Sequence, residues 1–162
     1  MIVAVVGSVA AAWCYSGAYN VAADEPHSSI AARALATIRD QSIAIRAEPL
    51  QVPNLANPAL IAQGAEHYAD MCTGCHLAPG MADSEMRQGL YPKPPNLTQR
   101  RARSPAESFW IIKHGIKMSA MPAWGSTHDD QTIWAIVAFL QQLPTLDASE
   151  YSALAAAPHA PD

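Results

Sequence analysis

The sequence predicts an all-α protein whose globular part is a small helical domain. Three segments between residues 57 and 143 place apolar residues at helical spacing behind cap residues, and no run alternates as a strand does. The chain has 162 residues, half of them apolar, and a formal net charge of −4. These values indicate roughly one domain, exclude a disordered chain, and argue against general nucleic-acid binding.

The first two helices of this domain have clear starting signals. The first is expected to begin at Asn57-Pro58, a cap residue followed by proline at the first helical position, and to continue to Met71. The second is expected to begin at Ser104-Pro105, with Glu107 completing a capping-box pattern, and to end at Gly115.

The third helix is expected to be capped near Thr127. Asp129 and Asp130 then fall in its first turn, where they complement the helix dipole, and Pro144 follows its end. A long proline-rich loop, residues 77–103, connects the first two helices. A core made only of three helices would be small for such loops, so a large apolar cofactor would complete it.

The N-terminal segment carries no charged side chain from Ile2 to Ala23. As a helix, this run is long enough to cross a hydrocarbon layer of about 30 Å. Asp24 and Glu25 then end it. We therefore expect residues 1–23 to form a transmembrane anchor, and the small residues before Asp24 leave a cleaved signal as the alternative.

The segments that flank the domain are expected to be less ordered. Residues 24–56 form a connector that is partly helical after Ser28 or Ser29, because Ile30 and the apolar residues after it share one face. From Ser42 to Arg46 polar and apolar residues alternate, so the helix is expected to end before them. The domain then covers residues 57–143, and residues 144–162 form a C-terminal tail.

The chemistry of the chain is concentrated in one motif, Cys72-Thr73-Gly74-Cys75-His76. This C-x-x-C-H pattern is the attachment signature of haem c. Two thiols on one turn can each form a thioether with a vinyl group of haem, and the adjacent His76 is then held under the iron. We therefore expect one haem c, bound covalently through Cys72 and Cys75.

A thiol redox role and a zinc site both fit the motif less well. A thioredoxin-like C-x-x-C needs a βαβ context, which the pattern does not provide. A structural zinc site needs four ligands, and there is no second cysteine pair. The remaining histidines lack a suitable spacing; they are His27, His67, His114, His128 and His159.

With these residues the chain resembles the class I c-type cytochromes, of the mono-haem, His/Met-ligated, membrane-anchored bacterial type. The resemblance rests on Gly64 and Tyr68, on Cys72 to His76, on Pro95-Asn96-Leu97 and on Met121-Pro122. It implies a class I cytochrome c fold wrapped round one covalently bound haem. In that fold the first and last helices of the domain cross, Gly64 permits their close approach, and Tyr68 packs near two aromatic residues, Trp134 and Phe139.

The iron needs a second axial ligand from farther along the chain. We choose Met121, because Pro122 prevents a helix there and the family pattern places its ligand directly before a proline. Met118 is expected to line the pocket wall, although a shift of three residues would exchange the two roles, and His114 is a minor candidate. The resemblance also implies that the Pro95 carbonyl accepts a hydrogen bond from the ring of His76.

Charge is unevenly distributed over the domain. Seven basic residues and one acid, Glu107, lie between residues 87 and 117, whereas residues 57–86 carry four acids and no base. Two interpretations stay open: a surface that steers docking to an acidic redox partner, or an ordinary solvated surface. The basic residues are Arg87, Lys93, Arg100, Arg101, Arg103, Lys113 and Lys117.

The resemblance implies a one-electron carrier between membrane or periplasmic redox proteins. The expected location is the bacterial cytoplasmic membrane, with the haem domain facing the periplasm and the N-terminal segment in the membrane. No nucleophile–base set is apparent, so we expect an electron-transfer protein, alone or as a subunit of an oxidoreductase complex, and not an enzyme by itself. The alternative is a haem-based binder or sensor of small ligands, which Met121-Pro122 argues against.

Overall fold

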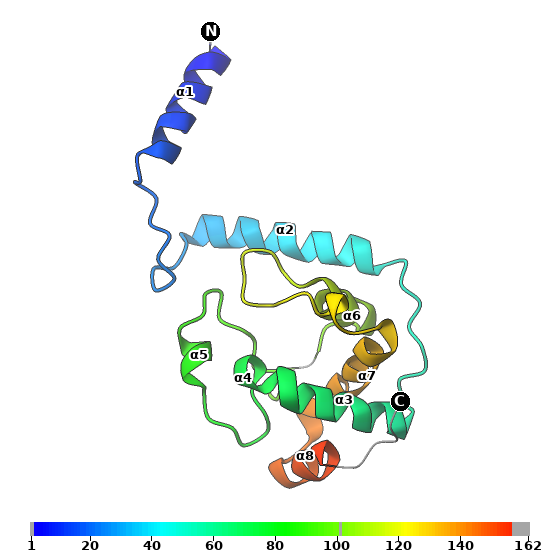
Figure 1. Cartoon of the computed structure of the whole chain (residues 1–162). Coiled ribbons are helices and arrows are strands. Elements are labelled where there is room, and N and C mark those ends of the chain that lie inside the picture. Colours follow the sequence, from blue (N-terminus) through cyan, green and yellow to red (C-terminus); the bar gives the residue numbers. More distant parts are fainter. Residues whose placement is uncertain (1, 101, 157–162) are drawn as a thin grey trace.

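The computed structural model describes residues 2–100 and 102–156, and all the regular structure in this part is helical (Figure 1). This confirms the all-α class. The helices are α1 (Ile2–Tyr15), α2 (Ser29–Ala47), α3 (Pro58–Met71), α4 (Thr73–His76), α5 (Glu85–Gln88), α6 (Pro105–His114), η1 (Trp124–Ser126), α7 (Asp130–Leu140), η2 (Leu143–Thr145) and α8 (Ala148–Ala155).

The centre of the domain is the crossing of α3 and α7, which make the most extensive contact between two elements (Figure 1). Gly64 makes the crossing possible. A Cβ atom at this position would overlap the backbone carbonyl of Ala135. The expected close approach at Gly64 is therefore confirmed.

Helix α7 is buried on nearly all sides, from Ile133 through Leu140. Such a helix forms the middle of a core and not its edge. Tyr68 of α3 packs on Phe139, with ring centroids 5.2 Å apart, as expected. Trp134 instead stacks on Phe109 of α6, with centroids 4.1 Å apart, so α6 joins the same core.

The helix starts follow local cap chemistry. The side chain of Asn57 accepts a hydrogen bond from the Ala59 amide, and that of Ser104 accepts one from Glu107, both as expected. The expected cap at Thr127 is wrong. The cap is Asp129, whose carboxylate accepts from the Thr132 amide at 2.8 Å, because Thr127 instead ends the short helix η1.

Helix α2 is longer than expected and does not end before Ser42. It continues to Ala47 because Ile43 and Ala47 are buried and the helix packs against α6. An ion pair holds it from the side: the guanidinium of Arg103 lies 2.6 Å from the Asp40 carboxylate. In Figure 1, α2 lies along one side of the domain.

The segment after residue 143, expected to be a tail, contains a further helix. Helix α8 begins with a capping box formed by Asp147 and Glu150, and it packs against α3. Its Tyr151 is buried next to Phe139. Residues 148–155 therefore belong to the packed domain, while residues 157–162 and His159 with them lie outside the described residues.

The expected transmembrane helix over residues 2–23 is not supported. Helix α1 covers 14 residues, Ile2–Tyr15, which is about 21 Å of helix against a hydrocarbon layer of about 30 Å. It ends where Ser16 Oγ donates to the Trp13 carbonyl and Gly17 adopts a φ of 70°. Within the described residues, no helix combines the length and apolar character needed to cross a membrane.

Candidate functional site

The C-x-x-C-H motif forms a tight turn directly after α3. Cys72 ends α3, with its amide bonded to the Tyr68 carbonyl, and the following residues form the single turn of α4. Both cysteines are free thiols and partly buried. Burial, reinforced by the neighbouring Cys75, raises the pKa of the Cys72 thiol to about 12. The structure thus presents two thiols on one turn, beside His76.

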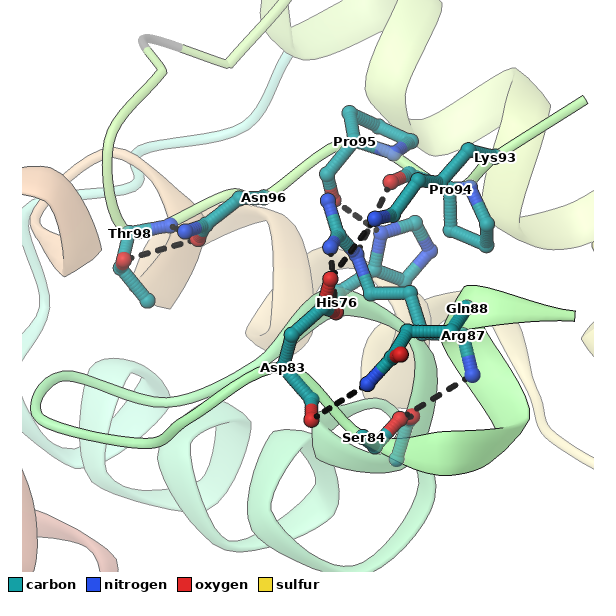
Figure 2. Close-up of polar contacts among 11 residues, drawn as sticks. His76, Asp83, Ser84, Arg87, Gln88, Lys93, Pro94, Pro95, Asn96 and Thr98 are labelled. Atoms are coloured by element: carbon teal, nitrogen blue, oxygen red, sulfur yellow. Dashed lines mark hydrogen bonds and ion pairs between the residues drawn. The ribbon is translucent and has the colours of Figure 1, made fainter. Parts of the chain in front are cut away.

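The ring of His76 is oriented by a backbone carbonyl. Its Nδ1–H donates to the Pro95 oxygen at 2.9 Å, which leaves Nε2 as the nitrogen available to a metal (Figure 2). Burial lowers the pKa of His76, the bond to Pro95 opposes that lowering, and the charge of Arg87 adds to it. A neutral imidazole with one directed lone pair is the form that binds metals.

The backbone around His76 is held from both sides. The Leu97 amide donates to the His76 carbonyl at 3.2 Å, and the Tyr68 hydroxyl donates to the Leu77 carbonyl at 2.7 Å. Leu77 itself is buried and adopts a φ of 65°, a conformation that residues with side chains rarely take. The chain therefore turns sharply away directly after His76.

Met121 lies in a loop that is tied back to the end of α6. The Ile116 amide donates to the Met121 carbonyl at 3.1 Å, and the Met121 amide donates to Ser119 Oγ at 3.2 Å. Gly115 makes this approach possible, because it has a φ of 65° and a Cβ there would lie 2.7 Å from the Met121 oxygen. The Met121 side chain is partly buried against the core, as is Cys72.

The two remaining candidates for the second axial ligand are placed differently. Met118 is 98% exposed and does not pack against the core as Met121 does, and its expected place in the pocket wall stays a prediction. Its φ of 56° marks a tight turn that directs it away from the core. His114 is exposed at the end of α6, with its ring 5.0 Å from that of Trp110.

Comparison with known families decides what kind of domain this is. A family model described as "Cytochrome C oxidase, cbb3-type, subunit III" matches residues 59–140, which is half of the chain. The chain belongs to this family. It is therefore a class I c-type cytochrome, with a domain whose function is haem-based electron transfer. Searches of curated proteins and of solved structures found no match.

The donor set of this cytochrome fits haem c. Two free thiols lie on one turn, and the next residue is a histidine whose Nδ1 is already committed to a carbonyl. A partly buried thioether, that of Met121, packs against the same core as Cys72. Soft sulfur and imidazole nitrogen are the axial donors of electron-carrying c-type cytochromes. The residues that could hold the group are therefore Cys72, Cys75, His76 and Met121.

Several basic residues of the cytochrome are neutralised by nearby acids. Arg87 and Lys93 both contact Asp83, and Lys113 contacts Asp130. Arg103 bonds with Asp40 of α2. Part of the positive charge between residues 87 and 117 is therefore paired with acids of the same chain. Arg101 lies outside the described residues.

Two residues outside the C-x-x-C-H turn hold it in place, and no motif in the sequence assigned them this role. The hydroxyl of Tyr68 was expected only to pack, but it bonds to the backbone beside His76. Ser84 donates from the long loop to the Gly74 carbonyl inside the motif, at 2.6 Å. A serine followed by an acidic residue is a cap signal, and at Ser84-Glu85 it marks the start of α5.

Replacing Tyr68 by phenylalanine tests this support. We expect Tyr68→Phe to lower the free energy of unfolding by about 1–2 kcal/mol, because the buried Leu77 carbonyl loses its donor. The matched control is Tyr15→Phe at a 92% exposed tyrosine, which should leave stability unchanged. Denaturant unfolding measures both, and equal stability of the two variants would show that the bond contributes nothing.

Proposed function

We propose that this cytochrome carries single electrons between redox proteins through one haem c, attached at Cys72 and Cys75 and ligated by His76 and Met121. The observation that carries the proposal is His76, whose Nδ1–H is fixed on Pro95 while two free thiols lie on the same turn. When bound, haem supplies an iron that accepts and releases one electron. The chain supplies the attachment, the orientation and the two axial donors.

The hydrogen bonds around His76 and Met121 favour electron transfer without movement of these two side chains. The bonds at Leu77, Leu97 and Pro95 fix the position of His76. The bonds of Ile116 and Ser119 likewise hold the loop of Met121. Ligands whose backbone is fixed by such bonds would change position little when an electron is gained or lost, and methionine ligation would raise the reduction potential. A labile distal side, as a ligand sensor needs, is not favoured by such a constrained loop.

A redox titration of the purified holoprotein tests the proposal. The expected result is one reversible transition with a one-electron slope, and no binding of CO to the reduced protein. Rapid CO binding by the reduced wild-type protein would contradict it and favour the alternative of a small-ligand binder.

A second candidate is an electron-transfer subunit of a larger oxidoreductase. The family description, which names a subunit of an oxidase, favours it. Purification of a tagged chain from solubilised membranes, with redox spectra of the co-purifying proteins, distinguishes an independent carrier from a subunit. Stoichiometric recovery with another haem protein supports the subunit, whereas a chain recovered alone supports the independent carrier.

For the location we propose the periplasmic side of a bacterial cytoplasmic membrane, with residues 1–23 directing the chain there. The support is the uncharged N-terminal run, in which every side chain of α1 is exposed. Fractionation and N-terminal sequencing of the mature protein test this. A membrane-bound chain that keeps its N-terminus supports attachment, a soluble chain that begins at Asp24 indicates a cleaved signal, and recovery in the cytoplasm contradicts the location.

A further inference from the structure

A small polar cluster lies against the turn that carries His76. Asp83 just before helix α5, Arg87 within it and Lys93 in the chain after it come together, with Arg87 and Lys93 both on the Asp83 carboxylate, close to Pro94 and Pro95 (Figure 2). Ser84 links the cluster to the motif, because its hydroxyl donates to the Gly74 carbonyl and accepts from the Arg87 amide. The loop of residues 77–103 is therefore hydrogen-bonded to the turn that carries Cys72, Cys75 and His76.

Arg87 is the member of this cluster that joins the two parts. Its Nη1 pairs with the Asp83 carboxylate at 2.5 Å, and its Nε donates to the Pro94 carbonyl at 3.1 Å. Its side chain is only 11% exposed, whereas that of Lys93 is 49% exposed. A guanidinium presents several donors in a fixed plane, so one residue can hold a carboxylate and a carbonyl at a set distance.

The position of the Pro94 carbonyl bears directly on His76. Pro94 and Pro95 share one peptide unit, and the next carbonyl, that of Pro95, accepts the His76 Nδ1–H. Proline has a fixed φ and restricts the residue before it, so the Pro94-Pro95 segment is stiff, but it has no amide hydrogen with which to hydrogen-bond itself to the rest of the domain. The bond from Arg87 provides a constraint from outside the segment.

We propose that Arg87 is a positioning residue for the His76 ligand: through the Pro94 carbonyl it holds the Pro95 oxygen on His76 Nδ1–H. This inference rests on the proposed ligation by His76 and deepens it. A metal-bound histidine that donates to a well-placed carbonyl is a more basic ligand, which favours the oxidised metal. Loss of the positioning therefore raises the reduction potential.

The decisive variant is Arg87→Lys in the full-length holoprotein. It keeps the charge but replaces the planar fork by one ammonium, which cannot hold Asp83 and Pro94 in the same geometry. We expect roughly tenfold faster exchange of the His76 ring N–H in the reduced protein, followed by NMR, and a higher reduction potential. Asp83→Asn, which leaves Arg87 in place without its partner, should shift the exchange in the same direction.

The matched control is Lys93→Met, which removes a cation from the same carboxylate. If Arg87 acts only by its charge, Lys93→Met changes the potential and Arg87→Lys does not, which overturns the proposal. If the His76 ring N–H of Arg87→Lys exchanges at the wild-type rate, the proposal is also overturned. A wild-type holoprotein without a haem-bound His76 signal would instead overturn the proposed ligation itself, so the two failures are distinguishable.

Discussion

Replacing Met121 by alanine is expected to open the distal side of the haem. Without the thioether, the variant should lose the methionine–iron charge-transfer band, bind CO when reduced, and show a potential lower by roughly 0.1 V, a fraction of the ~0.8 V range that axial ligands cover. The physical reason is that thioether sulfur favours the reduced iron, and Met118, the other methionine of this loop, is 98% exposed. Absorption spectra and a redox titration measure these changes.

Met118→Ala is the matched control for this experiment. Its side chain is 98% exposed, three residues from Met121, so the band, the potential and the resistance to CO should be those of the wild type. If Met118→Ala loses the band while Met121→Ala keeps it, the assignment of the axial methionine is wrong.

Introducing a side chain at Gly64 is expected to disrupt the helix crossing. A Cβ there would overlap the Ala135 carbonyl, which belongs to the backbone of a buried helix and cannot move aside as a side chain can. We expect Gly64→Ala to lower the free energy of unfolding by about 3 kcal/mol or more, the upper end of the cost of overpacking. That is a large share of the ~5–15 kcal/mol typical of a domain. Denaturant unfolding of the holoprotein measures it.

Gly89→Ala provides the comparison. Gly89 is exposed, and a Cβ there would meet its nearest neighbour, the Met86 carbonyl, at 3.8 Å, an ordinary contact. Its stability should stay close to that of the wild type. Similar losses in the two variants would show that the effect is general to glycine replacement and not specific to the crossing of α3 and α7.

The features that the sequence predicted correctly depend on neighbours in the chain. The caps at Asn57 and Ser104 are signalled by residue types and short spacings. The close approach at Gly64, a contact with the distant Ala135, was instead implied by the family resemblance. Helix α2 was predicted too short because its last turn is held by burial of Ile43 and Ala47, which local propensity does not show. The N-terminal helix was predicted too long because hydropathy alone gave no weight to Gly17.

In the site, too, the features signalled by nearby residues were predicted, and the supporting tertiary contacts of Ser84 and Arg87 were not. The spacing of Cys72, Cys75 and His76 identifies the attachment turn without any structure. The bracing of that turn comes from residues that are distant or unremarkable in the sequence, such as Ser84 and Arg87. Their roles depend on how the long loop folds back, and that path is set by tertiary contacts and not by a motif.

Covalent attachment of haem to Cys72 and Cys75 is decided by mass spectrometry of the denatured chain. We expect the mass of the chain plus one haem, and after proteolysis the haem mass on the peptide that spans residues 72–76. Cys75→Ser should impair attachment in the same measurement. A wild-type chain that releases all its haem on denaturation, or that carries haem on another peptide, would contradict the account.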